Sequence, residues 1–333
     1  MKFKKLLSFI LLVSVIVGVF SVSAIESSAN TIEDNLVFNL NQSGNLSVDG
    51  GGHAKAYYKF TLNSYTTLLI DYEGNYYKEA YIEIIKESDR HNYDIGREVN
   101  YCFYEKSDGN GDYQWLEKEV SLNKGSYYFI IDSYLWYDVL DYDLTVTPTV
   151  KGLKNLKATT TDSTAKLTWT GDKGAVGYQV QKNTSSGYKL VKTTSGTSYT
   201  AKNLTSATSH KFRVRGYTTV SGKKYYGSWK NITAITKPSK VSIKTPTTNK
   251  KHKITAKWGK IARASGYQVQ FCKNKACSKV FLSKTVSGQS KVSYTASKFT
   301  KNKKYYIRIR AYKTINGKKY YGAWSSIKTI KCK

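Results

Sequence analysis

The second half of the chain contains one pattern twice, and this duplication restricts what the chain can fold into. In order, each copy has a Trp, the sequence Gly-Tyr-Gln-Val-Gln, an Arg-x-Arg segment, and a Gly-Lys-Lys-Tyr-Tyr-Gly segment followed by a second Trp. The first copy places these features at Trp169, 177–181, 212–215 and 222–229, and the second at Trp258, 266–270, 307–310 and 317–324. The copies differ in length only between the Gln-containing and Arg-containing segments, where a surface loop absorbs an insertion cheaply. The duplication predicts two domains of one fold.

Short alternating runs of aromatic and β-branched residues extend this prediction to the whole chain. In 36–148 such runs include 56–62, 67–72 and 126–131, each bounded by Gly, Asn, Asp or Ser. This spacing is typical of β-sandwiches. In the duplicated half, Ser221-Gly222 and Asn316-Gly317 predict tight two-residue hairpins, because both positions favour the left-handed backbone. We therefore expect an all-β protein of three tandem β-sandwiches.

The amino terminus has the pattern of a secretory signal peptide. Residues 1–24 contain three lysines, then an apolar run, then Val-Ser-Ala. A retained membrane helix is the alternative, and the shortness of the apolar run argues against it. We expect cleavage of this leader, a mobile polar segment at 25–35, and no membrane insertion of the mature chain.

Charge divides the chain into two unlike parts. The formal net charge is +30, yet residues 25–148 hold 21 acids against 9 bases, whereas 149–333 hold 41 bases and only Asp162 and Asp172 as acids. Such a field attracts anionic partners and accelerates their encounter. Outside a cell these partners are wall polymers, acidic polysaccharide, extracellular DNA or the protein's own acidic domain. The alternative is that the charge serves solubility alone.

The acidic region is similar to a known type of module. The runs 57–62, 122–129 and 142–144 resemble the bacterial pre-peptidase C-terminal type of β-sandwich, and the likeness covers 36–148. The resemblance implies a jelly-roll-like, non-catalytic appendage of a secreted protein.

The two basic copies, 152–237 and 238–333, resemble the fibronectin type III domain, an immunoglobulin-like sandwich. The likeness rests on the strand-two Trp, the Gly-Tyr-Gln-Val-Gln strand, and the spacing of Phe299 and Tyr305, which is that of a tyrosine corner. The first copy has Leu204 and His210 at the corner positions, where a histidine can still bond the backbone. The lysine-rich form of this domain is common in secreted proteins of Gram-positive bacteria, which the resemblance therefore implies as the source.

Prolines and cysteines add local expectations. Pro148 and Pro238 suit linkers at 147–152 and 236–240, because proline cannot donate to a sheet ladder. Cys272 and Cys277 flank four residues between two strand-like runs, so they can face each other across a hairpin and form a disulfide. Cys102 and Cys332 then remain, and Cys102 is expected to be a small buried residue.

A catalytic function has little support in the sequence. Motifs such as Gly-x-Ser-x-Gly, His-Glu-x-x-His and a phosphate-binding glycine loop are absent, and we predict no catalytic residue, metal or cofactor. Residues 108–112 space three oxygen donors as calcium loops do, with Glu119 at the twelfth place. However, Tyr113 occupies the place that demands glycine, so a solvated turn is the better interpretation.

Two groups of residues are candidates for ligand binding. Tyr134, Trp136 and Tyr137 lie beside acids, a mixture that suits a glycan site, although packing onto the same sandwich or a protein contact would also explain it. The second group lies on outward positions of the basic domains. Its arginines are Arg213, Arg215, Arg308 and Arg310, and its neighbours are Gln179, Gln181, Lys211, Tyr217, Gln268, Gln270 and Tyr312. Arginine beside Tyr and Gln can bind phosphate or carboxylate, but it can equally form cross-strand pairs on a solvated face.

Together these features favour a secreted, non-catalytic, modular binding protein held noncovalently at a cell surface or matrix. Its basic domains would attract anionic wall polymer or polysaccharide, and its first sandwich would bind glycan or protein. The alternatives are an extracellular DNA-binding matrix protein and an accessory region of a secreted hydrolase. A further possibility is an intramolecular contact between the acidic and basic domains.

Overall fold

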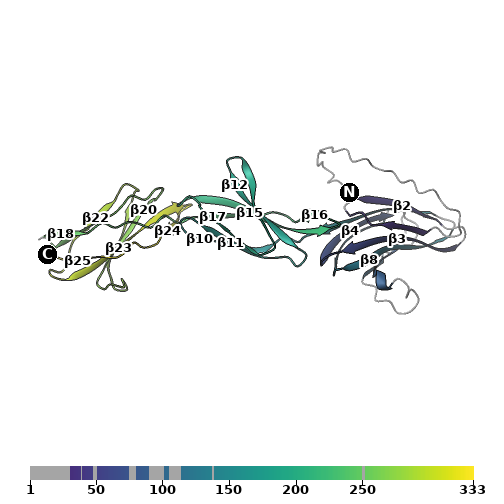
Figure 1. Ribbon diagram of the computed structural model, residues 1–333, viewed down its shortest axis with the longest axis horizontal. Helices are drawn as coiled ribbons and strands as arrows, with labels where there is room; N and C mark the ends of the chain where they lie inside the picture. Colours follow the sequence, from purple (N-terminus) through teal and green to yellow (C-terminus); the bar gives the residue numbers. More distant parts are fainter. Residues whose placement is uncertain are drawn as a thin grey trace.

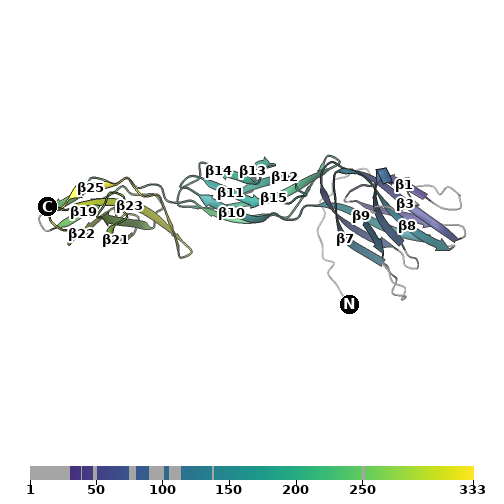
Figure 2. The ribbon, with the colours of Figure 1, turned by 90° about the horizontal axis from the view of Figure 1, so that it is seen from below.

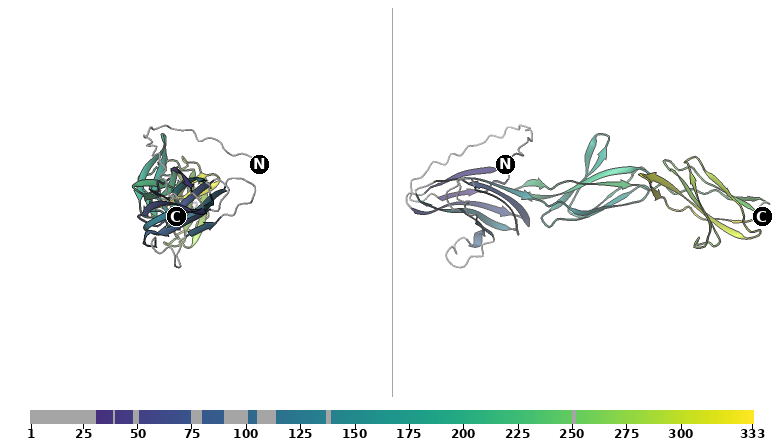
Figure 3. Two further views of the ribbon diagram at one scale, coloured as in Figure 1. Left: turned by 90° about the vertical axis from the view of Figure 1, so that its right-hand side faces the viewer. Right: turned by 180° about the vertical axis from the view of Figure 1, so that it is seen from behind.

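The computed structural model describes residues 31–38, 40–47, 51–74, 80–89, 101–104, 114–136, 139–249 and 252–333. The expected signal peptide and the calcium-like run 108–112 lie outside these residues. Regular structure in the described part is β, apart from one 3₁₀ turn at Glu87–Asp89. Three β-sandwiches follow one another along one long axis (Figure 1 and Figure 3). The predicted all-β, three-sandwich fold class is confirmed.

The amino-terminal sandwich is a jelly roll, as predicted. Eight of its strands follow the orders β3-β8-β5-β6 and β2-β9-β4-β7, so consecutive strands alternate between the two sheets except for β5 and β6. The strand bounds are β2 (Asn41–Ser47), β3 (Gly51–Leu62), β4 (Thr66–Gly74), β5 (Ala80–Lys86), β6 (Tyr101–Tyr104), β7 (Gln114–Leu122), β8 (Gly125–Trp136) and β9 (Val139–Thr149).

One extra strand corrects a sequence expectation. Residues 31–35, which we expected to be part of a mobile segment, form β1 (Thr31–Asn35). This strand pairs in parallel with β3 and extends that sheet at its edge. Its polar composition hides it in the sequence, because an edge strand is held by main-chain bonds rather than by an apolar face.

Alternate residues of the two sheets fill the core of the jelly roll, and three tyrosines lie together in it. The hydroxyls of Tyr58 and Tyr142 are 2.6 Å apart, and the ring of Tyr72 stacks on that of Tyr142. A Cβ at Gly44 would lie 2.2 Å from the Tyr142 hydroxyl, so this strand must carry glycine there. Burial raises the pKa of all three phenols.

The first basic domain packs a three-stranded sheet, β10-β11-β14, against β13-β12-β15-β16, with β17 also paired to β15. The strand bounds are β10 (Lys154–Thr160), β11 (Ala165–Thr170), β12 (Gly177–Thr184), β13 (Gly187–Thr194), β14 (Ser198–Ala201), β15 (Ser209–Val220), β16 (Lys223–Tyr226) and β17 (Lys230–Ile235). Trp169 on β11 is 5% exposed, and its ring centroid lies 5.4 Å from that of Tyr178 on β12. The Trp and Tyr of the repeated pattern thus join the two sheets.

The second basic domain repeats this arrangement with the orders β18-β19-β22 and β21-β20-β23-β24, with β25 also paired to β23. It lies at the carboxyl-terminal end of the molecule, beyond the first basic domain (Figure 2). The strand bounds are β18 (Thr247–Asn249), β19 (Lys253–Lys257), β20 (Gly266–Cys272), β21 (Val280–Ser287), β22 (Ser293–Ala296), β23 (Lys304–Ile315), β24 (Lys318–Tyr321) and β25 (Lys328–Lys331). Trp258 and Tyr267 repeat the core contact at 5.3 Å. Pro246 directly precedes β18.

Turn and corner expectations are met in detail. The four hairpin residues Ser221, Gly222, Asn316 and Gly317 have φ values of 48°, 76°, 48° and 75°, as a two-residue hairpin of this kind requires. The Tyr305 hydroxyl accepts a hydrogen bond from the Thr300 amide at 3.1 Å, which completes the tyrosine corner. In the first copy, Nε2 of His210 lies 3.0 Å from the Thr205 carbonyl, also five residues back.

The first linker begins later than expected, because Thr147 and Pro148 belong to β9 and Pro148 lies opposite Leu68 of β4. The chain before each basic domain packs closely on the domain that follows it. A Cβ at Gly227 would lie 2.7 Å from the carbonyl oxygen of Val150, and a Cβ at Gly322 would lie 2.5 Å from that of Pro238. The second glycine of the repeated Gly-Lys-Lys-Tyr-Tyr-Gly segment is therefore needed for close approach of the preceding chain.

The first junction is a packed interface between the jelly roll and the first basic domain. Val220, at the tip of the β15–β16 hairpin, is 1% exposed and belongs to the core cluster of the jelly roll, with Tyr225 packed against it. Lys151 forms an ion pair with Glu119 at 2.9 Å, and the Lys173 ammonium lies 4.3 Å from the Tyr65 ring centroid. The described contacts between acidic and basic regions thus lie at their adjoining ends.

Candidate ligand-binding face

The outer face of the β12-β15 sheet carries the predicted arginines. Along β15, Phe212 and Val214 are buried, so Arg213 and Arg215 point to the opposite face. The register places Gln181 directly opposite Arg213 and Gln179 directly opposite Arg215. Local strand alternation and cross-strand register therefore bring these four side chains together.

Aromatic rings lie beside both arginines. The centroid of Trp229 is 4.4 Å from the guanidinium carbon of Arg213 and 4.3 Å from that of Arg215. Trp229 comes just before Lys230, which pairs with the residue between the two arginines, so the indole lies between them. Tyr188 adds a contact with Arg213 at 4.3 Å, and Tyr226 adds one with Arg215 at 3.8 Å. Such contacts stabilise cations by roughly 0.5 to 2 kcal/mol each.

A lysine and a third tyrosine extend the row. The Lys224 ammonium is 4.7 Å from the Tyr217 ring, whose centroid lies 6.0 Å from that of Tyr226. We call this alternating row the first ladder. It consists of Lys224, Tyr217, Tyr226, Arg215, Trp229, Arg213 and Tyr188.

The second domain builds a matching second ladder. Trp324 lies 4.3 Å from both Arg308 and Arg310, and Tyr321 lies 4.0 Å from Arg310. The row continues through Tyr312 to Lys319, whose ammonium is 5.0 Å from the Tyr312 ring. The second ladder consists of Lys319, Tyr312, Tyr321, Arg310, Trp324 and Arg308.

Glutamines hold the arginine side chains in place. Nε of Arg213 donates to Oε1 of Gln181 at 2.8 Å, and both Nε and Nη2 of Arg215 donate to Oε1 of Gln179 at 3.1 and 2.9 Å. In the second ladder, Nε of Arg308 donates to Gln270 at 2.9 Å and Nε of Arg310 to Gln268 at 2.7 Å. Each guanidinium is thus fixed through its Nε edge.

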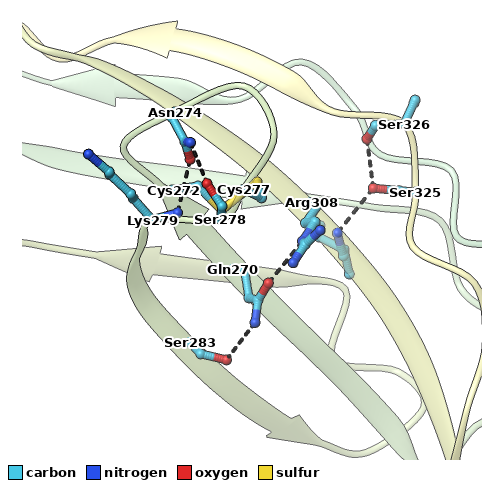
Figure 4. Close-up of a disulfide and its surroundings, with 11 residues drawn as sticks. Gln270, Cys272, Asn274, Cys277, Ser278, Lys279, Ser283, Arg308, Ser325 and Ser326 are labelled. Carbon is cyan, nitrogen blue, oxygen red and sulfur yellow. Dashed lines mark hydrogen bonds between the residues drawn. A yellow bond between two sulfur atoms is a disulfide. The ribbon is translucent and has the colours of Figure 1, made fainter.

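The ladders differ at one end, where the second domain carries a disulfide. Cys272 and Cys277 are joined with a Cα–Cα distance of 5.1 Å, which closes the turn between β20 and β21 (Figure 4). Asn274 caps this turn, since its Oδ1 accepts from the Lys279 amide at 3.0 Å and its Nδ2 donates to Ser278. No residue of the described part takes the place of Tyr188 beside Arg308.

The positive charges of the arginines on this face are not balanced by nearby acids. Burial lowers the pKa of Arg215, Tyr226 acts in the opposite direction, and Arg213 makes a smaller lowering contribution. The pKa of Arg310 is lowered in the same way, by burial first, with Tyr321 opposing and Arg308 adding to the effect. Within 152–333, the described residues form no ion pair, and the pair between Lys151 and Glu119 lies at the junction. The arginine charges therefore have aromatic and amide neighbours rather than carboxylates.

Sequence reasoning found the arginines and glutamines but not the tryptophans between them. The signal was present, because Trp229 and Trp324 occupy matching places in both copies. Strand alternation does not place either Trp beside the arginines, because each lies outside the named strands, just before the chain pairs again with β15 or β23. Tyr312, expected to point outward, does lie on this face but is only 3% exposed, since Tyr321 and Lys319 cover it.

The other predicted sites are placed only in part. Tyr134 and Trp136 lie at the end of β8 opposite His53 and Gly51 of β3, and Tyr137 lies outside the described residues. The glycan site at this position stays a prediction. Cys332 is a free, buried cysteine in the core of the second basic domain.

The described ranges contain no group of three His, Cys, Asp or Glu side chains placed to hold a metal ion. The same part of the chain has no helix with the length and apolar character needed to cross a membrane.

The strand order identifies the fold of the basic domains. Both have three strands packed on a sheet in which the third and sixth strands are central neighbours. Both are fibronectin type III-like β-sandwiches.

No family model matches this sequence, and neither does any curated protein sequence. Among solved structures, a two-domain fibronectin type III segment of chicken tenascin is 16% identical, with 54% of this chain and 99% of that one covered and a TM-score of 0.37. The chicken interferon gamma receptor alpha chain is 13% identical, with coverages of 55% and 98% and a TM-score of 0.34. FN3tt is 21% identical, with coverages of 26% and 94% and a TM-score of 0.23. These likenesses are too distant to carry an argument about function. The fold of the basic domains is assigned from their strand order.

Proposed function

We propose that this chain is a secreted, non-catalytic binding protein whose two basic domains bind an anionic wall polymer or polysaccharide at a bacterial surface or matrix. One observation carries the proposal. Residues 149–333 contain 41 Lys and Arg against two acids, and the described residues of 152–333 form no ion pair. Fibronectin type III-like sandwiches act as modular scaffolds, which suits such a role.

Counterion release supplies the driving force. A polyanion carries condensed small cations, and lysines that neutralise its charges release them into solution. The ladders add arginines at fixed positions to this field. The jelly roll, which is acidic, contributes nothing to this attraction, and we assign it to a glycan or protein contact through the region of Tyr134, Trp136 and Tyr137.

The test is binding of the full chain to immobilised wall polymer across a salt series. We expect affinity to fall by about 10³-fold or more between 50 and 200 mM salt, as for proteins that make several phosphate contacts. Binding that persists unchanged in molar sodium chloride would contradict the proposal.

Small-angle scattering on the same samples tests whether the acidic jelly roll covers the basic domains. An extended particle at both low and high salt leaves the basic face open. Compaction at low salt would instead mean that the acidic jelly roll folds back onto the basic domains and competes with the polymer.

Extracellular DNA is the second candidate, because it presents the same kind of charge. Proteins that bind single strands also stack bases on aromatic rings, but the rings of Trp229 and Trp324 are already in contact with two guanidinium groups each. Competition decides between the candidates. Wall polymer should displace DNA readily, and failure to do so would favour the matrix function.

A further inference from the structure

We infer that the arginine pairs of the two ladders are specific anion sites, and that their ligand is a linear phosphodiester polymer whose successive charges are bound by successive arginines. This inference rests on the proposed function and names the part of the basic domains that recognises the polymer. It concerns Arg213 with Arg215, and Arg308 with Arg310.

The first support is that the guanidinium groups are held rigidly while their outer edges stay open. Each Nε is engaged by a glutamine, and each guanidinium contacts at least one ring. The terminal nitrogens of Arg213, Arg308 and Arg310 have no described hydrogen bond, and none of them is among the buried unpaired side-chain atoms. These nitrogens therefore face water, in an orientation fixed before any ligand arrives.

The second support is the chemistry of that open edge. Two terminal N–H groups of one guanidinium lie in a plane and match two oxygens of a phosphate or carboxylate. Because the side chain is already ordered, little rotamer entropy is lost when an anion binds. A lysine on the same surface offers only a mobile point charge, so the ladder arginines are the better positioned anion ligands.

The third support is the absence of any internal counterion. In each ladder two positively charged arginines lie on either side of one Trp, and no carboxylate of the described residues pairs with them. An anion bound to the pair would relieve this repulsion. The glutamines cannot do so, because their amides are neutral.

Spacing and ring contacts favour a phosphodiester chain over a carboxylated polysaccharide. Arg308 and Arg310 are alternate residues of one strand, so they repeat at about 7 Å along the face. A polymer with one phosphate in each short repeat unit can place successive anions on successive rungs. Sugar rings bind by stacking on free aromatic faces, whereas Trp324 and Tyr321 already contact arginine.

The experiment compares variants of the full chain that separate charge from geometry. In the double variant Arg308→Lys, Arg310→Lys the net charge is unchanged but the fixed planar edges are lost. The matched control is Lys253→Gln, Lys257→Gln, which removes two exposed charges from β19 on the other sheet. The probe is poly(glycerol phosphate), with a polyuronate and single-stranded DNA as comparison ligands.

We expect the arginine double variant to bind the probe about tenfold more weakly, although it keeps its charge, and the lysine control to lose less affinity. NMR signals of the Arg308 and Arg310 Nε–H groups should also shift when the probe is added to the wild type. This second measurement needs no substitution, so it remains decisive if the variant fails to fold.

The outcomes are distinguishable. Probe binding that is equal in wild type and arginine variant, with unmoved arginine signals, would overturn the inference and leave the proposed function intact. No salt-sensitive binding of any polyanion by the wild type would overturn the proposed function itself. Equally tight binding of the polyuronate would refute the phosphodiester assignment, and preferential binding of DNA would support the phosphodiester chemistry while assigning its source to nucleic acid.

Discussion

The two basic domains share a ladder but differ in what surrounds it. Arg213 contacts two rings, those of Tyr188 and Trp229, whereas among the described residues Trp324 supplies the one ring beside Arg308. The difference follows from the hairpin at that end, because β12 and β13 meet in a turn that brings Tyr188 back over the arginine, and the corresponding turn of the second domain is closed by Cys272 and Cys277. Repeated strand positions thus preserve the ladder, while the turn decides how enclosed its last rung is.

A second difference lies at the hairpin tips. Val220 is buried in the jelly-roll core, whereas its counterpart Ile315 is half-buried. The same hairpin therefore serves as a cross-domain core element in one copy and as a half-buried tip in the other. What differs is the neighbouring domain rather than the hairpin itself.

The largest expected effect tests this junction. Val220→Asp should destabilise the jelly roll and its junction by about 3 kcal/mol or more, because an unpaired carboxylate would be buried in an apolar core. Ile315→Asp should cost less, since that tip is half-buried. Hydrogen exchange read by mass spectrometry on the full chain would locate each loss. Equal losses at both tips would contradict the distinction.

Removal of the disulfide should affect the second domain only. Replacing both Cys272 and Cys277 with Ala opens a very short loop, for which the chain-entropy model gives about 2 kcal/mol. The expected result is lower protection of β20 and β21 against hydrogen exchange, with unchanged protection of β12 and β13. Reduction of the wild type should give the same pattern, and an equal effect in the first domain would refute it.

Substitutions at the two corner residues should cost less stability than the changes above, and the cost should differ between the two basic domains. Tyr305→Phe removes the hydroxyl that accepts from the Thr300 amide and should cost about 1 kcal/mol. His210→Phe should cost less, because the Nε2 contact with Thr205 is exposed and its carbonyl can bind water instead. Denaturant unfolding of each variant measures the two losses.

The smallest expected effect is the change in unfolding free energy with pH, which should be slight near neutral pH. Burial raises the pKa of Tyr178 and of Tyr225 in the first basic domain above the usual value of about 10. The neutral phenols are favoured in the folded state, so this stability is fully present below pH 10 and is lost as pH rises above it. A fall in unfolding free energy that begins well below pH 10 would point to other groups.

Comparison of the two copies also shows why part of the candidate face was predictable. Arg308 and Gln270 could be placed on one face because strand alternation is local and the pattern occurs twice. Trp324 could not be placed beside Arg308, because that contact joins segments brought together only when β25 and its preceding residues pair with β23. The same holds for Tyr312, whose burial depends on β24.

The amino-acid sequence by itself determined the all-β class, the duplication, the hairpin turns and the division of charge, because each depends on local geometry or on composition. Only the tertiary structure decided that β1 joins a sheet edge, that Val220 completes the core of another domain, and that each tryptophan lies between two arginines. These outcomes depend on which surfaces meet when sheets twist and domains pack. Such contacts leave no periodic trace along the chain.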